Sequence, residues 1–99
     1  MNEKGWQCFL KLCLSTQDEK MLSELLTLFL TPEEKNSIET RCLIVKALLD
    51  HKKTQRQISE DLNVSIAKIT RGSNELKRIP LKLKQFLQEK LGVNLLSDS

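Results

Sequence analysis

Glycine and proline are scarce in this sequence, at three and two among 99 residues, so few positions interrupt regular structure. No segment alternates apolar and polar residues for long enough to indicate a β-strand. The sequence therefore predicts an all-α fold with about six helices, given the usual mean helix length of about 11 residues. The length fits one domain, which we expect to span residues 1–99.

Cysteine and histidine are also few. Cys8, Cys13 and Cys42 are odd in number and form no Cys-x-x-Cys pair, and His51 is the only histidine. This pattern argues against a disulfide framework, and we expect no metal site. We expect the cysteines to be small apolar residues in or near a core, kept as free thiols in the cytoplasm.

Long apolar runs are missing as well. No stretch approaches the roughly 20 apolar residues that span a bilayer, so we expect no membrane partner. The segment 6–14 is interrupted by Gln7 and Lys11 and is followed by no small-residue cleavage site, which argues against a signal peptide. The sequence also lacks a nucleophile elbow and a phosphate loop, so we expect neither an enzyme nor a cofactor.

Charge is unevenly distributed along the chain. Residues 51–90 hold ten Lys or Arg against four Asp or Glu, a local charge of +6, whereas residues 1–31 carry −1. An anionic partner for the C-terminal half is indicated if the cations share a face. The alternative is an ordinary solvated face.

Helix signals recur along the whole chain. Segments 6–14 and 21–29 carry apolar residues at helical spacing. Thr31 is expected to cap a helix that begins at Pro32 and runs to about His51. Its expected apolar stripe is Ile38, Cys42, Val45 and Leu49, with Ile44 and Leu48 beside it.

Further start and stop signals follow. Thr54 and Gln57 form a capping box for the next helix, and Asn63 suits its left-handed end. Pro80 is expected at the start of a last helix.

Residues 55–74, "QRQISEDLNVSIAKITRGSN", fit a helix-turn-helix, in which two short helices are joined by a turn of about three residues. The buried positions would be Ile58, Leu62, Val64 and Ile69. The outward positions are short polar or cationic groups suited to phosphates and base edges: Arg56, Ser65, Lys68, Thr70 and Arg71. DNA binding is therefore favoured over an ordinary helical pair. Position 72 would usually be apolar, but it is a glycine, so something else must occupy that space.

Three segments, "LTPEEKNSIETR", "TQRQISEDL" and "IAKITRGSNELK", resemble the bacterial tryptophan repressor family. The resemblance covers about residues 25–91. It implies a six-helix chain intertwined with a second copy as a homodimer, L-tryptophan as the corepressor ligand, and a palindromic double-stranded operator as the DNA partner. The implied function is tryptophan-dependent repression of the transcription of tryptophan-related genes.

The resemblance also implies a set of ligand-binding residues. Arg71 would bind the carboxylate, and Arg41 would lie over the indole, where a cation–π contact contributes about 0.5–2 kcal/mol. Gly72 would leave room for the ligand. The carbonyl groups of Leu28 and Leu30, the Thr31 hydroxyl and Glu75 would lie near the ammonium group. Glu75 stands where the family usually has a small hydroxyl residue.

The DNA-binding residues implied by the resemblance are Arg56, Ser59, Ile66, Ala67, Lys68 and Thr70. Two of them depart from the family, which usually has a lysine at position 59 and a threonine at position 68. Two other functions compete with this interpretation. One is a helix-turn-helix protein that binds DNA without a ligand. The other is a helical module for an acidic protein partner, which is disfavoured because the basic helices lack large exposed apolar anchors.

Overall fold

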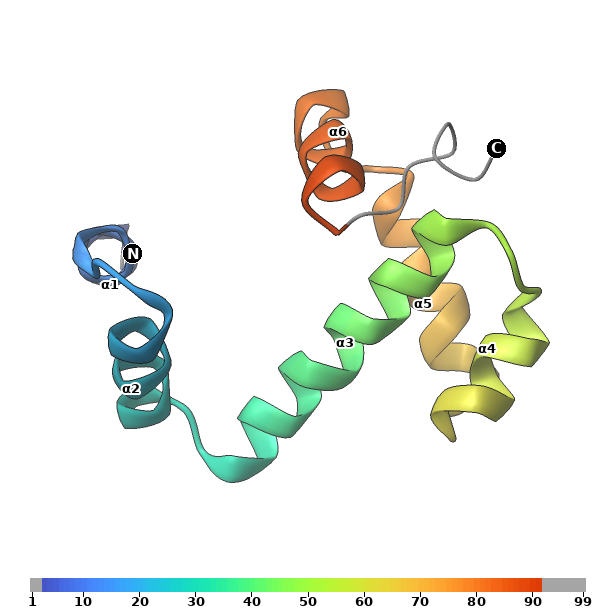
Figure 1. Cartoon of the computed structure of the whole chain (residues 1–99), viewed down its shortest axis with the longest axis horizontal. Helices are drawn as coiled ribbons and strands as arrows, with labels where there is room; N and C mark the ends of the chain where they lie inside the picture. The colour runs from blue at the N-terminus through green and yellow to red at the C-terminus, as the bar shows by residue number, and fades with distance from the viewer. Residues whose placement is uncertain (1–2, 92–99) are drawn as a thin grey trace. The chain divides into compact units, whose positions relative to one another are not determined.

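The computed structural model describes residues 3–91, and within that range it contains six α-helices and no strand. The predicted all-α class is therefore confirmed. The helices are α1 (Glu3–Ser15), α2 (Glu19–Phe29), α3 (Pro32–Asp50), α4 (Gln55–Leu62), α5 (Ile66–Leu76) and α6 (Leu81–Lys90) (Figure 1). The chain divides into two compact units, residues 1–36 and 37–99, which are described separately below.

Short-range hydrogen bonds fix the starts of several helices. The Thr31 hydroxyl accepts from the Glu34 N–H at 3.1 Å, and the Glu34 carboxylate accepts from the Thr31 N–H at 2.8 Å. Thr54 and Gln57 form the same reciprocal pair at 3.1 and 2.8 Å. Each pair satisfies two backbone donors that a helix start leaves free. Both predicted start points are thus confirmed, and Asp18 provides a further cap for α2.

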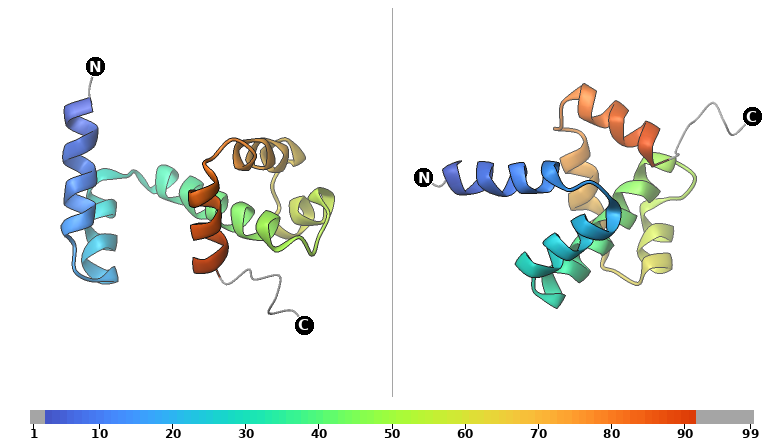
Figure 2. Two further views of the ribbon diagram at one scale, coloured as in Figure 1. Left: turned by 90° about the horizontal axis from the view of Figure 1, so that it is seen from above. Right: turned by 60° about the vertical axis from the view of Figure 1, so that its left-hand side comes forward.

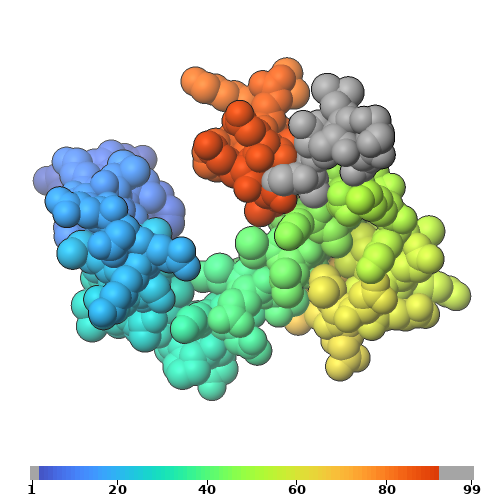
Figure 3. Space-filling view, in the orientation of Figure 1, coloured from blue at the N-terminus to red at the C-terminus, as the bar shows by residue number. Residues whose placement is uncertain are grey.

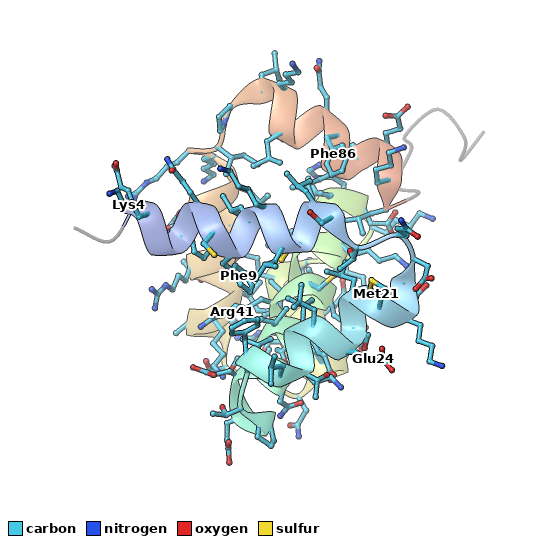
Figure 4. All side chains as sticks on the ribbon, turned by 90° about the vertical axis from the view of Figure 1, so that its left-hand side faces the viewer. Lys4, Phe9, Met21, Glu24, Arg41 and Phe86 are labelled. Carbon is cyan, nitrogen blue, oxygen red and sulfur yellow. The ribbon has the colours of Figure 1, made fainter. Side chains whose placement is uncertain are left out.

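The first unit holds an aromatic cluster between its two helices. The rings of Trp6 and Phe9 stack with centroids 5.6 Å apart, and Phe9 meets Phe29 edge to face at 5.4 Å. Phe9 is labelled on α1 in Figure 4. No residue of α1 or α2 is fully buried, and Trp6 remains 63% exposed.

The second unit has a small core built by three helices. Ile44 of α3, Ile58 of α4 and Ile69 of α5 are buried together. The residues packed around them are Ala47, Leu48, Leu62 and Val64. α4 and α5 lie against the C-terminal half of α3 in both Figure 1 and Figure 2.

The core face of α3 differs from the expected stripe. Of the four stripe residues only Leu49 is buried, whereas Ile38 is 48% exposed and Cys42 is exposed. Ile44 and Leu48, expected beside the stripe, pack toward α4 and α5 instead. The helix carries apolar residues on two sides, so periodicity could not tell which side this unit buries.

The cysteines are free thiols, but their expected burial is wrong for two of them. Cys8 and Cys42 are exposed, and Cys13 is half-buried. Cys8 and Cys42 lie on helices whose apolar sides are only partly covered by this chain. Separately, none of the helices within residues 3–91 is both long and apolar enough to cross a membrane.

Gly72 of α5 lies directly against side chains of α3. A Cβ atom at this position would lie 3.1 Å from the Cγ2 of Ile44 and 3.5 Å from the Cδ1 of Leu48. The space that an apolar residue would usually fill is therefore taken by a side chain of α3. This contact explains why a glycine is present inside a helix, where it is otherwise unfavourable.

Replacing Gly72 by alanine should therefore not stabilise the protein, although alanine is favoured in a helix by about 1 kcal/mol. Gly5 of α1 is the matched control, because a Cβ there would meet nothing within 4 Å. Gly5→Ala should raise the free energy of unfolding by about 0.5–1 kcal/mol, and Gly72→Val should lower it by about 1–3 kcal/mol through overpacking. Urea denaturation at one fixed protein concentration measures all three. Equal stabilisation by both alanine variants would contradict the packing account.

Candidate DNA-binding and ligand-binding sites

α4 and α5 are joined by a tight, well-defined turn. Asn63 ends α4 in the left-handed conformation, at φ 55° and ψ 49°, as its sequence context predicts. The Val64 N–H donates to the Ser59 carbonyl at 3.1 Å, and the Ser59 hydroxyl donates to the Val64 carbonyl. Ser65 then caps α5 by accepting from the Lys68 N–H at 3.3 Å.

The two helices also share buried side chains. Ile58 is 1% exposed and Ile69 is fully buried, so each helix fixes the other through the core. Two short helices joined by three residues and packed in this way have the geometry of a helix-turn-helix.

Five of the six candidate DNA-binding residues are exposed on this pair of helices: Arg56, Ile66, Ala67, Lys68 and Thr70. Figure 3 shows α4 at the surface of its unit. Ser59 differs, because it is half-buried and its hydroxyl is already bonded inside the turn. Its position favours a structural role over a contact with DNA.

The cations on this surface differ in their partners. Lys53, just before α4, forms an ion pair with Asp61. Within residues 3–91, neither Arg56 nor Lys68 forms an ion pair. Their charges are thus available to an anionic partner such as a DNA phosphate.

Gln55 is a polar residue of this surface that the sequence analysis did not single out. The Thr70 hydroxyl donates to the side-chain carbonyl of Gln55 at 3.1 Å, which links the start of α4 to the middle of α5. A glutamine directly after a cap residue is a common pattern. Only the folded arrangement shows that Thr70, fifteen residues later, reaches it.

Four candidate residues for the ligand occupy the second unit. They are Arg41 on α3 and Arg71, Gly72 and Glu75 on α5, where the last three lie within about one turn of one another at i, i+1 and i+4. Gly72 faces Ile44 and Leu48, and Arg41 precedes these two residues by three and seven positions on α3. Helical geometry therefore places Arg41, labelled in Figure 4, and Arg71 beside the α3–α5 crossing.

The other three candidate residues belong to the first unit. Thr31 is exposed and acts as a helix cap, with its hydroxyl accepting from the Glu34 N–H. Leu28 is 76% exposed and Leu30 is half-buried. Their expected contribution is through backbone carbonyl groups, which their side-chain exposure does not affect.

Glu75 has a partner other than Arg71, the candidate residue for the ligand carboxylate. Its carboxylate lies 3.8 Å from the Arg78 guanidinium, and both side chains are largely exposed. Within residues 3–91, Arg71 forms no ion pair. Its guanidinium is thus available to the carboxylate of a ligand.

A small helical core that presents two joined helices with available cations defines a class of protein, the helix-turn-helix DNA-binding regulators. The chain belongs to the Trp repressor protein family, which its sequence matches over residues 4–91.

Relatives of similar length share much of the sequence. The Trp operon repressor homolog of Chlamydia trachomatis serovar D is 48% identical over 89 residues, covering 90% of this chain and 95% of that protein. The homolog of Pasteurella multocida is 39% identical over 90 residues, covering 91% and 88%. The homolog of Vibrio campbellii is 47% identical over 74 residues, covering 75% and 74%.

Proposed function

We propose that this chain is a tryptophan-dependent transcriptional repressor that binds a palindromic operator and blocks transcription of tryptophan-related genes. Membership of the Trp repressor family supports the function. The structural observation that supports this function most is that α5 holds candidate residues for both the ligand and the DNA. One stripe of this helix holds Arg71 and Gly72 beside α3, and other exposed positions hold Ala67 and Thr70 for DNA.

The two polar groups of tryptophan, its carboxylate and its ammonium group, are bound by protein groups of the opposite polarity. Arg71 binds the tryptophan carboxylate through its planar guanidinium, and Arg41 covers the indole. The carbonyl groups of Leu28 and Leu30 and the Thr31 hydroxyl accept from the ammonium group. Glu75 lies one turn beyond Arg71, and its carboxylate adds a further acceptor near the ammonium.

The shared helix provides the coupling between ligand and DNA. A ligand beside the α3–α5 crossing favours the position of α5 in which the helix-turn-helix fits the major groove. Operator DNA favours the same position of α5. Tryptophan and the operator therefore each strengthen binding of the other. Couplings of this kind are usually about 1–3 kcal/mol, or roughly 5–150-fold in affinity.

The alternatives are less well supported. A helix-turn-helix protein that acts without a ligand is not favoured, because the relatives are Trp operon repressor homologs along most of this chain. Regulation by DNA binding requires no catalytic step and no cofactor besides the corepressor. The cytoplasm, where bacterial DNA is found, is the compartment that this function requires.

The proposed assembly is a homodimer, since a palindromic operator presents two equivalent half-sites. The apolar surface supports this proposal. Only four hydrophobic residues within the described range are buried, whereas large apolar side chains are exposed on α1, α2, α3 and α6. Examples are Leu14 at 85%, Phe29 at 51% and Phe86 at 51%, the last labelled in Figure 4. A second copy would cover surface that a monomer leaves in water.

Sedimentation equilibrium at micromolar concentration should therefore give twice the chain mass. Leu14→Glu and Phe86→Glu should each shift the protein toward the monomer, because they place a charge on apolar surface. Lys20→Glu, at an exposed polar position of α2, is the control and should remain dimeric. A helical wild-type protein that sediments as a monomer would rule out the intertwined dimer.

Arg71→Ala should abolish the tryptophan response while retaining the fold, because Arg71 is exposed and contributes to no core. Isothermal calorimetry should show tryptophan affinity reduced at least about tenfold, the effect expected when a charged hydrogen bond of about 1.5–3 kcal/mol is lost. Arg78→Ala removes an equivalent charge just beyond the C-terminal end of α5 and should bind tryptophan normally. Undiminished tryptophan binding by the Arg71 variant would refute the assigned role.

Arg56→Ala and Lys68→Ala should weaken operator binding without changing tryptophan binding. A lost phosphate contact lowers the salt slope of binding by about 1 per chain, whereas a lost base contact costs about 1–3 kcal/mol and relaxes preference at one position. Ser59→Ala should leave the salt slope unchanged and lower the free energy of unfolding by about 0.5–1.5 kcal/mol, because its hydroxyl is used in the turn. Operator affinity preserved in both cation variants would count against α4 and α5 as the DNA-binding surface.

A further inference from the structure

We infer that Glu75 shifts the selectivity of the ligand site toward indole compounds that carry an α-ammonium group and away from indole carboxylates that lack one. The inference rests on the proposed function, because it names the class of ligand that the site beside α3 and α5 prefers. A carboxylate at position 75 attracts the ammonium group of an amino acid and repels a ligand whose only charge is negative.

Glu75 and Arg71 lie one turn apart on the same side of α5. Residues at i and i+4 of a helix have Cβ atoms about 5–6 Å apart, so their side chains can reach the same small molecule. Glu75 also follows Gly72 by three residues, which places it next to the point where α5 faces Ile44 and Leu48 of α3. The candidate site therefore has an anion and a cation within reach of one ligand.

The two charges do not neutralise each other. The carboxylate of Glu75 pairs with Arg78 at 3.8 Å, and the Glu75 side chain is 62% exposed. Such an exposed pair is weak, so the ammonium group of a ligand can displace Arg78 from the carboxylate. Among the described residues 3–91, Arg71 has no ion-pair partner.

An α-amino acid matches this arrangement of charges. Its carboxylate and its ammonium group are attached to one carbon atom, so they are close together and opposite in sign. Arg71 can bind the carboxylate through its planar guanidinium, while Glu75 accepts from the ammonium group. An indole carboxylate without the ammonium group offers Glu75 no donor and places a second negative charge near it.

The charge of Glu75 therefore has opposite effects on two closely related ligands. L-Tryptophan gains an attraction at its ammonium group. Indole-3-propionate is tryptophan with the ammonium group replaced by hydrogen, so it experiences only the repulsion between carboxylates. Neutralising Glu75 should weaken binding of the first ligand and strengthen binding of the second. A residue that only stabilised α5 would change both affinities in the same direction.

Isothermal calorimetry on the full-length protein measures this difference in sign. Glu75→Gln keeps the size of the side chain and removes its charge. It should bind tryptophan about fivefold or more weakly, the difference between hydrogen bonds to a charged and to a neutral acceptor. It should bind indole-3-propionate about threefold more tightly, as expected when a repulsion between charges about 6 Å apart in water is removed. Circular dichroism checks that the variant retains its helices.

Two control variants separate a ligand contact from other effects of charge. Glu89→Gln removes an exposed carboxylate from α6 and should leave the ratio of the two affinities unchanged. Arg78→Ala removes the partner of Glu75 but keeps the carboxylate, so it should also preserve the ratio. If Arg78→Ala changed the ratio as Glu75→Gln does, the effect would belong to the ion pair, and the direct contact would be overturned.

The possible outcomes distinguish this inference from the proposed function. Wild-type protein that binds neither ligand would overturn the proposed function, and the inference with it. Wild-type protein that binds tryptophan would leave the proposed function standing. In that case, a Glu75→Gln variant in which both affinities are unchanged, or shift in the same direction, would overturn the inference alone.

Discussion

The close approach of α3 and α5 at Gly72 is the contact on which the rest of the second unit depends. Because Gly72 has no side chain, Ile44 can approach the backbone of α5 and still be buried with Ile58 and Ile69. These three isoleucines come from three helices, so they fix α4 and α5 against α3 together. The orientation of the exposed surface that carries Arg56 and Thr70 follows from this packing.

Much of the fold could be predicted because its signals are local. The capping pair of Thr54 and Gln57 and the left-handed Asn63 each involve residues within three or four positions of one another. Their outcome is decided by backbone hydrogen bonds and sterics before any tertiary contact forms. The core face of α3 was predicted only in part, because its apolar residues cover two sides and Leu49 alone of the expected stripe is buried. Only the docking of α4 and α5 selects the side with Ile44.

The site was predictable in part, for a related reason. The sequence drew attention to Gly72, because glycine inside a helix next to Arg71 is unusual, but it could not show that Ile44 is the neighbour. Arg41 and Arg71 were paired by resemblance, since no local rule joins residues on separate helices. The bond between Thr70 and Gln55 was missed for the same reason. Contacts between residues far apart in sequence are decided by packing, which local patterns do not specify.

The small size of this core also bears on regulation. Elements that move on ligand binding belong to the less stable parts of a protein, where few buried contacts resist a change. α5 contributes one fully buried residue, Ile69. At Gly72, where α5 faces Ile44 and Leu48 of α3, it has no side chain to add to the contact. A ligand wedged beside that crossing would therefore need only a modest free energy to favour one position of α5. The glycine thus permits close packing of α5 against α3, and under the proposed function it would leave α5 able to respond to a ligand.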